Sequence, residues 1–212
     1  LATGLSGGDP VFTNVPRDVT GLGSGVTMIT AGGAHACALL DDATVRCWGA
    51  NAKGQLGDGT TTDSDQPLAV AGLTDVASIS AGGESTCALL TTAAVRCWGS
   101  NEYGQLGNGS VAAMSTSPVD VTGLASGVTS LDGGYYHACA VQAGIVRCWG
   151  NNAYGQLGTG TLTQSNVPAA LSTVPPVLQA ATQPSGATAG ADLVTQPVFH
   201  ITDADGNLLS GI

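Results

Sequence analysis

The chain has 212 residues, of which 9% are charged, and fifteen acidic against five basic side chains give it a net charge of −10. Binding to nucleic acid needs Lys and Arg to displace counterions from phosphates, so this charge argues against a chromatin or RNA partner. An anionic membrane surface would repel the chain, and the sequence has no run of about 18 apolar residues that could span a bilayer. We therefore expect neither nucleic-acid binding nor membrane insertion.

In chain order, the first expected strand spans residues 26–30 and ends before a glycine pair, and the next two span residues 34–40 and 44–48. After a glycine-rich loop, a fourth strand spans residues 67–71, with Pro67 at its start, where a missing N–H is harmless. These segments are mostly apolar on both faces. That pattern is expected of a small sheet that lies between two other sheets.

The same pattern returns twice more along the chain. The segment Val-Arg-Cys-Trp-Gly-x-Asn begins at Val45, Val95 and Val146, and each copy continues into Gly-Gln-Leu-Gly-x-Gly. A repeat of roughly fifty residues predicts four-stranded blades that stack or arrange radially, because no single unit can bury its own faces. The predicted ranges are about 9–25 for a partial blade, and 26–73, 76–124 and 128–172 for three complete blades.

Each unit contains three motifs in a constant order. They are Ala-Gly-Gly-x-His-x-Cys-Ala-Leu, then Val-Arg-Cys-Trp-Gly-x-Asn, then Gly-Gln-Leu-Gly-x-Gly, with variations between copies. Together they resemble the regulator of chromosome condensation repeat over about residues 9–172. The resemblance implies an all-β fold of β-propeller blades, in a bacterial secreted or surface form, that binds a partner through a propeller face. The nucleotide-exchange role of the eukaryotic members is not carried over, because this chain is acidic, rich in cystine and short of blades.

Two cysteines in each repeat flank the turn between the second and third strands. They are Cys37 and Cys47, Cys87 and Cys97, and Cys139 and Cys148. Opposed residues of antiparallel strands have Cα atoms about 4.5 to 5.5 Å apart, close to the span that a disulfide accepts, so we predict one disulfide within each repeat. Each should stabilise the fold by about 2 to 3 kcal/mol and indicates a location outside the cytosol. Zinc is the alternative, but these pairs lack the close spacing of zinc ligands.

A tryptophan and an arginine flank the second cysteine of each repeat. We expect Trp48, Trp98 and Trp149 to form the core between blades, where each ring buries a large apolar surface. The alternative is that these rings are platforms for stacking on a sugar or a cation. The arginines should lay their stems along the sheet and bond backbone carbonyls. They are Arg46, Arg96 and Arg147.

The remaining candidates for chemistry have structural interpretations. His35 and His137 are equivalent, but the middle repeat has Ser85, so we expect structural imidazoles rather than a metal or acid–base site. The Gly-Gln-Leu-Gly-x-Gly loop lacks the Lys-Ser/Thr of a phosphate-binding loop, and we expect a turn in which Asn51 or Asn101 bonds its own backbone. The carboxylate clusters lie in predicted turns, at Asp41 and Asp42, Asp63 and Asp65, and Asp203 and Asp205. We predict no catalytic residue, no cofactor and no metal.

The repeat pattern ends after Thr173. Residues 173–180 are predicted to form an extended linker, because two adjacent prolines lie within them. Residues 181–212 resemble the first strands of a bacterial immunoglobulin-like domain. Such a sandwich needs about seven strands and about 100 residues, so this segment cannot complete a core by itself.

Closed propellers contain about four to eight blades, and three blades leave sheet edges and apolar faces exposed. We therefore expect protein partners, either other parts of a longer chain or identical subunits. No signal peptide is visible after Leu1, but the cysteine pairs indicate an extracellular or cell-surface location. The function that fits is a non-enzymatic module for protein interaction or surface display. The alternative is a structural subunit of an extracellular filament or surface layer, completed by strand exchange between copies.

Overall fold

The computed structural model describes residues 16–171, 177–180 and 199–202. The chain divides into two compact units, Leu1–Leu171 and Ser172–Ile212. Every regular element in the described ranges is a β-strand, which confirms the predicted all-β fold. Within these ranges, no helix has the length and apolar character that a membrane span requires.

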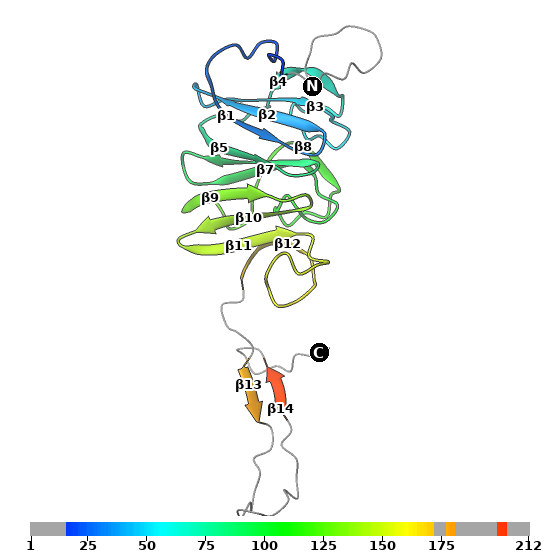
Figure 1. Ribbon diagram of the computed structural model, residues 1–212, viewed down its shortest axis with the longest axis vertical. Helices are drawn as coiled ribbons and strands as arrows, with labels where there is room; N and C mark the ends of the chain where they lie inside the picture. The colour runs from blue at the N-terminus through cyan, green and yellow to red at the C-terminus, as the bar shows by residue number, and fades with distance from the viewer. Residues whose placement is uncertain (1–15, 172–176, 181–198, 203–212) are drawn as a thin grey trace, which may run out of the picture. The chain divides into compact units, whose positions relative to one another are not determined.

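The first unit contains three four-stranded antiparallel sheets, which we call blades 1, 2 and 3 (Figure 1). Blade 1 comprises β1 (Val26–Ala31), β2 (His35–Leu40), β3 (Val45–Gly49) and β4 (Ser64–Ala69). Blade 2 comprises β5 (Val76–Ala81), β6 (Ser85–Leu90), β7 (Val95–Ser100) and β8 (Met114–Asp120). Blade 3 comprises β9 (Val128–Gly133), β10 (His137–Gln142), β11 (Ile145–Gly150) and β12 (Ser165–Ala170). In each blade the strand order across the sheet follows the chain order, so the first and fourth strands form the edges.

The blades pack against one another through two equivalent cores. Between blades 1 and 2, the Cys37–Cys47 disulfide and Leu56 of blade 1 pack with Ile79 and Trp98 of blade 2. The corresponding residues between blades 2 and 3 are Cys87, Cys97, Leu106, Leu131 and Trp149. Each of these interfaces therefore buries the disulfide of one blade under the tryptophan-bearing face of the next.

The outward faces of blades 1 and 3 are more open. Ile29 of blade 1 is 64% exposed, whereas the equivalent Ile79 is 2% exposed. On blade 3, Val146 is 37% exposed, whereas the equivalent Val95 is 1% exposed. A hollow of about 110 Å³ lies beside Val146 and Cys139. The two outer faces thus show side chains that the inner blade interfaces bury.

The fourth strand of blade 1 begins earlier than predicted. In blade 1, β4 begins at Ser64 rather than at Pro67, so the proline lies inside the strand. It is tolerated because β4 is an edge strand whose pairing with β3 shifts register between Cys47 and Gly49, where the regular ladder is interrupted. The equivalent prolines are Pro118 in β8 and Pro168 in β12.

The second unit is described as one pair of strands. β13 (Val177–Ala180) pairs with β14 (Phe199–Thr202) in antiparallel orientation. The segment predicted as a linker, residues 173–180, therefore contains a strand, because its extended backbone finds hydrogen-bond partners in β14. Apart from β14, the predicted immunoglobulin-like segment, residues 181–212, lies outside the described residues.

Candidate functional site

The connections between strands lie at two opposite ends of each blade. The turn between the first and second strands shares one end with the long loop between the third and fourth, because consecutive antiparallel strands reverse direction. We call this end of the three blades the loop face. It carries the Gly-Gly turns and the Gly-Gln-Leu-Gly-x-Gly loops.

A buried asparagine organises each long loop. The Oδ1 atom of Asn51 accepts a hydrogen bond from the N–H of Leu56 at 2.9 Å, and its Nδ2 atom donates to the carbonyls of Thr60 and Thr62. The equivalent bonds in the other blades are made by Asn101 and Asn152. The sequence predicts a bond to the asparagine's own backbone, but the side chain instead bonds backbone groups that lie five to eleven residues further along the chain. One amide thus orders the whole loop.

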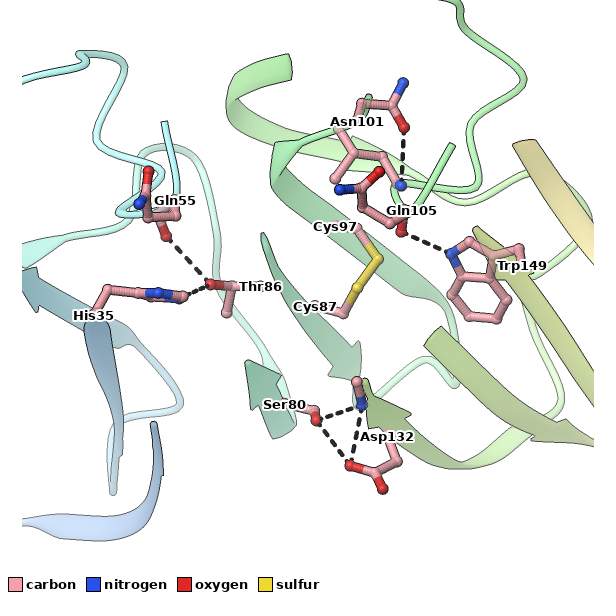
Figure 2. The surroundings of a disulfide bond; sticks show 12 residues. His35, Gln55, Ser80, Thr86, Cys87, Cys97, Asn101, Gln105, Asp132 and Trp149 are labelled. Atoms are coloured by element: carbon pink, nitrogen blue, oxygen red, sulfur yellow. Dashed lines mark hydrogen bonds between the residues drawn. A yellow bond between two sulfur atoms is a disulfide. The ribbon is translucent and has the colours of Figure 1, made fainter. Parts of the chain in front are cut away.

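A glutamine in each loop holds the residue two positions before it. The Oε1 atom of Gln55 accepts from the backbone N–H of Lys53 at 2.8 Å. Its backbone carbonyl accepts from the indole N–H of Trp98, in the next blade, at 2.9 Å. The equivalent residues one blade further on are Gln105, Tyr103 and Trp149. Figure 2 shows the bond from Trp149 to Gln105. Each of these two loops is therefore tied to the following blade and presents one residue at a defined place.

The tryptophan rings lie inside the molecule. Trp98 and Trp149 are 0% exposed, and Trp48 is covered by Val19 and Leu22, which precede blade 1. Because both faces of Trp98 and Trp149 are buried, neither ring can stack on a sugar or a cation. Trp98 and Trp149 therefore pack between blades rather than forming a ligand platform, whereas Trp48 packs against the segment that precedes blade 1.

All six cysteines pair within their own blades. The Cys87–Cys97 disulfide joins directly opposed residues of β6 and β7, with Cα atoms 4.0 Å apart (Figure 2). The other disulfides are Cys37–Cys47 and Cys139–Cys148. In the part of the chain that the structure describes, no group of three His, Cys, Asp or Glu side chains is placed to hold a metal ion. The disulfides therefore act as bonds between neighbouring strands.

His35 joins two blades as a neutral side chain. Its Nε2 atom lies 2.8 Å from Thr86 Oγ1 of blade 2, and that hydroxyl lies 3.2 Å from the carbonyl oxygen of Gln55 (Figure 2). Thr86 has one proton, so it donates to Gln55 and accepts from Nε2–H. Burial lowers the pKa of His35 to about 4. His137 is less buried. Burial lowers its pKa too, although the negative charge of Asp132 acts in the opposite direction.

The three arginines do not share one role. The prediction that each bonds backbone carbonyls is wrong for Arg96, which bonds a carboxylate, and the buried Nε atom of Arg147 has no hydrogen-bond partner. The Nε atom of Arg96 pairs with the carboxylate of Asp120 at 2.8 Å, because these two residues are directly opposed across β7 and β8. An alanine occupies the position of Asp120 in the other two blades. Arg46 and Arg147 therefore have no opposed carboxylate.

Positions that differ between the blades lie together on the loop face. The chain contains one lysine, two glutamates and four tyrosines. The lysine, both glutamates and three of the tyrosines occupy neighbouring turns and loops of this face. They are Lys53, Glu84, Glu102, Tyr103, Tyr135 and Tyr136. We call these six residues the tyrosine–glutamate patch.

Three aromatic rings form the centre of the patch. The ring centroids of Tyr103 and Tyr136 lie 4.9 Å apart with planes tilted by 47°, and those of Tyr135 and Tyr136 lie 4.4 Å apart at 78°. Partial removal from water, with smaller contributions from Tyr135 and Glu84, raises the pKa of Tyr136. Tyr135 is 58% exposed. The patch thus contains three aromatic rings in contact with one another, and at least the ring of Tyr135 is exposed to solvent.

Charged groups from two blades border these rings. Lys53 of blade 1 forms an ion pair with Glu102 of blade 2, and this contact raises the pKa of Lys53, with a smaller contribution from Glu84. Glu84 follows the Gly-Gly turn of blade 2, and its charge also acts on Tyr136. With one ammonium group against two carboxylates, the patch is negatively charged.

A shallow hollow of about 220 Å³ borders the patch along the Gly-Gly turns. It is lined by Ala31, Gly32, Gly33, Ala81, Gly82, Gly83, Gly133, Gly134 and Tyr135. Backbone hydrogen bonds join consecutive turns, from Gly33 N to Gly83 O at 2.9 Å and from Gly83 N to Tyr135 O at 3.0 Å. A Cβ atom at Gly82 would collide with the carbonyl oxygen of Gly134, so turns this close require glycine. The wall at Tyr135 belongs to both the hollow and the patch.

None of the six patch residues is singled out by the repeat motifs. A motif directs attention to positions that are the same in every blade, whereas the positions of the patch differ between blades, and only Tyr103 has an equivalent of its own type, Tyr154 in blade 3. For example, Ala34, Glu84 and Tyr136 occupy equivalent positions in blades 1, 2 and 3. The signal that could have revealed the patch is therefore the departure of single positions from an otherwise constant repeat.

Two sequence profiles of the Regulator of chromosome condensation (RCC1) repeat match the chain. One matches residues 26–55 and 76–105, and the other matches residues 42–89, 95–141 and 144–182. Among curated proteins, the E3 ubiquitin-protein ligases HERC2 of Homo sapiens and of Mus musculus are each 39% identical to the chain over 70 residues. That match covers 32% of this chain and 1% of each ligase.

Solved propellers have the same arrangement of blades. Human WBSCR16 is 26% identical with a TM-score of 0.62, covering 71% of this chain and 38% of that chain. Yeast RCC1 (Prp20), solved with Kap60 bound, is 22% identical with a TM-score of 0.61, covering 78% and 39%. Prp20p from Saccharomyces cerevisiae, studied for its binding to Gsp1p and histones, is 21% identical with a TM-score of 0.62, covering 78% and 41%. The three sheets are thus propeller-type blades, and because the repeat profiles match more than half of its length, the chain belongs to the RCC1 repeat family.

Proposed function

We propose that this chain is a non-enzymatic binding module, extracellular or at the cell surface, that holds a protein partner on its loop face. The observation that carries the proposal is the tyrosine–glutamate patch, which gathers the only lysine, both glutamates and three of the four tyrosines of the chain. Propellers of this family commonly serve as protein-interaction modules, and the family generally binds or regulates rather than catalyses.

The chemistry of the patch suits a protein partner. Tyrosine is enriched in protein interfaces because it buries a large, rigid surface at a low cost in conformational entropy. The rings of Tyr103, Tyr135 and Tyr136 contact one another, and Gln105 holds the backbone of Tyr103, so less freedom is lost on binding. The named partners of the yeast relatives, Kap60, Gsp1p and histones, are also proteins. This supports the class of partner, not its identity.

The loop-face assignment is tested with the double variant Tyr135→Ser/Tyr136→Ser and a matched control, Tyr154→Ser. Tyr154 is 93% exposed and lies outside the patch. Immobilised wild-type and variant proteins are incubated with the extracellular fraction of the source culture, and the retained proteins are quantified by mass spectrometry. We expect the wild type and the control to retain the same proteins, and the double variant to retain about tenfold less of them. Equal retention by all three proteins would remove the loop face as the binding surface.

The extracellular location is supported by the three disulfides, since such bonds persist in oxidising compartments. We also propose that residues 181–212 begin an immunoglobulin-like domain of a bacterial surface protein that carries repeats over residues 1–172. The location is tested by alkylating the folded protein, recovered from its source without reductant, and counting modified cysteines by mass spectrometry. Six protected cysteines are expected, and free thiols would contradict the location.

A second candidate function is structural, and the open outer faces of blades 1 and 3 favour it. Ile29 and Val146 would be buried if another blade packed on each face, as Ile79 is buried between blades 1 and 2. That blade would come from further repeats of a longer chain or from identical subunits, which could assemble into a filament or surface layer. Light scattering over a wide range of concentration tests self-assembly. A mass that grows with concentration supports it, and a constant monomer mass contradicts it.

A further inference from the structure

We infer that the tyrosine–glutamate patch recognises a cationic side chain, carried by an extended basic segment of the partner and bound beside Glu84. The inference rests on the proposed function, because it names the chemistry by which the loop face selects its partner. It is carried by the charges, the rings and the hollow of this surface.

Glu84 is the carboxylate of the patch that lacks a cation. Glu102 is paired with Lys53. Among the residues that the structure describes, the other ion pair joins Arg96 to Asp120, so no Lys or Arg lies within ion-pair distance of Glu84. Glu84 is half-buried, which limits its access to water. A half-buried carboxylate without a partner is stabilised by an incoming cation.

The rings beside Glu84 are arranged in a way that suits a cation. The faces of tyrosine rings attract ammonium and guanidinium groups. Because Tyr135 and Tyr136 meet at 78° and Tyr103 is tilted by 47° to Tyr136, the rings present faces in more than one direction. A guanidinium group can stack on one ring while it bonds a carboxylate, so arginine should bind more tightly than lysine.

The patch already holds one ammonium group of the chain itself. Lys53 reaches from the loop of blade 1 to Glu102 of blade 2, and the two glutamates raise the pKa of Lys53. The acidic side chains are therefore placed to hold a cation at this surface. The net charge of −10 adds a field that attracts basic segments over a longer range.

The hollow along the Gly-Gly turns favours an extended segment over a free cation. It has a volume of about 220 Å³, begins at Tyr135, and is lined otherwise by glycine and alanine. Residues that flank the bound cation could therefore lie against backbone without meeting a bulky side chain. This places the cation at Glu84 and the rest of the segment along the turns.

The four tyrosines allow a direct test on the full chain. With fluorotyrosine in place of tyrosine, fluorine NMR gives one signal for each ring, and Tyr154 serves as an internal reference outside the patch. The probe is the blocked peptide Gly-Ser-Arg-Gly-Arg-Ser-Gly, and its control has neutral citrulline in place of each arginine. We expect the arginine peptide to shift the signals of Tyr103, Tyr135 and Tyr136 saturably, and the citrulline peptide to shift none.

Two variants with the same change in charge separate recognition from general attraction. Glu84→Gln removes the unpaired carboxylate, and Asp42→Asn removes an exposed one from the β2–β3 turn, at the opposite end of blade 1. We expect Glu84→Gln to weaken binding of the arginine peptide by about tenfold or more, and Asp42→Asn to change it by less than about twofold. An unchanged Tyr154 signal and an unchanged circular dichroism spectrum without peptide check that each variant is folded.

Four results would overturn the inference. Equal weakening by both variants, or a parallel shift of the Tyr154 signal, would show attraction by net charge alone. Saturable binding of a neutral oligosaccharide to the same three rings, independent of Glu84, would assign the patch to a different ligand. The proposed function fails separately: if Tyr135→Ser/Tyr136→Ser loses protein partners while the arginine peptide does not bind, the loop face stands and cation recognition falls. If the arginine peptide binds while Tyr135→Ser/Tyr136→Ser retains its protein partners, the patch binds a cation but the loop face is not the surface that holds those partners.

Discussion

The interior of the blades and their loop face use the same repeat in opposite ways. In the interior, residues recur: Trp98 and Trp149 each donate to a glutamine carbonyl of the preceding blade. On the loop face, equivalent positions hold Ala34, Glu84 and Tyr136. Interior residues must match the neighbours that they contact, whereas residues of the face meet solvent and can differ. The comparison teaches that departures from the repeat, rather than the repeat itself, identify the candidate binding surface.

The largest expected effect comes from breaking the interior between blades 1 and 2. Trp98→Ala removes a ring that is 0% exposed and its hydrogen bond to the Gln55 carbonyl, so the free energy of unfolding should fall by about 3 to 5 kcal/mol. Urea denaturation followed by circular dichroism measures it. Tyr154→Ala is the control on the loop face and should change the free energy of unfolding by less than about 0.5 kcal/mol. Similar losses in both variants would contradict the distinction between interior and face.

A smaller loss is expected when a disulfide inside the stack is removed. Cys87→Ala/Cys97→Ala opens a loop with a sequence separation of 10, which should lower the free energy of unfolding by about 2 to 3 kcal/mol. Cys139→Ala/Cys148→Ala should cost less, because Cys139 is only half-buried on the outer face of blade 3. Urea denaturation of both variants makes the comparison. An equal or greater loss of unfolding free energy for Cys139→Ala/Cys148→Ala would show that burial of a disulfide under the next blade does not add to its contribution.

The free energy of unfolding should also decrease as the pH is lowered, because His35 lies at an interior contact between blades. Burial lowers its folded pKa from 6.5 to about 4, so the unfolded chain binds more protons between these values. The stabilisation is complete above the unfolded pKa and is lost as the pH falls toward the folded pKa, by about 2 kcal/mol between pH 7 and pH 5. Urea denaturation at both pH values compares the wild type with His35→Asn. The variant should keep only the smaller dependence that His137 contributes, and an undiminished dependence would contradict the role of His35.

The smallest effect on stability is expected on the loop face. Glu84→Gln and Tyr135→Ser should each change the free energy of unfolding by less than about 0.5 kcal/mol, because neither side chain fills a core between blades. The same variants should weaken partner binding. Thermal unfolding monitored by circular dichroism is the measurement. A loss close to that of Trp98→Ala would give the patch a structural role instead.

Local features of one blade could be predicted well, and contacts between distant strands could not. The opposition of Cys37 and Cys47 follows from a short turn and the antiparallel pairing of its two strands. Pro67 predicts a strand that starts at residue 67, but β4 starts at Ser64, because the interrupted pairing with β3 lets the proline lie inside the strand. No local pattern predicts the pairing of Arg96 with Asp120, because Asp120 lies 24 residues further along the chain.

The sequence by itself determined the repeat, the all-β class and the neighbouring cysteines, because these depend on period, alternation and short turns. Only the tertiary structure decided which side chains meet on the loop face. Lys53 and Glu102 lie 49 residues apart, and they are joined because the blades stack in register. The same stacking brings Tyr103 against Tyr136. No local signal marks such pairs, since each residue lies in its own turn or loop and gains its partner only when one blade packs on the next.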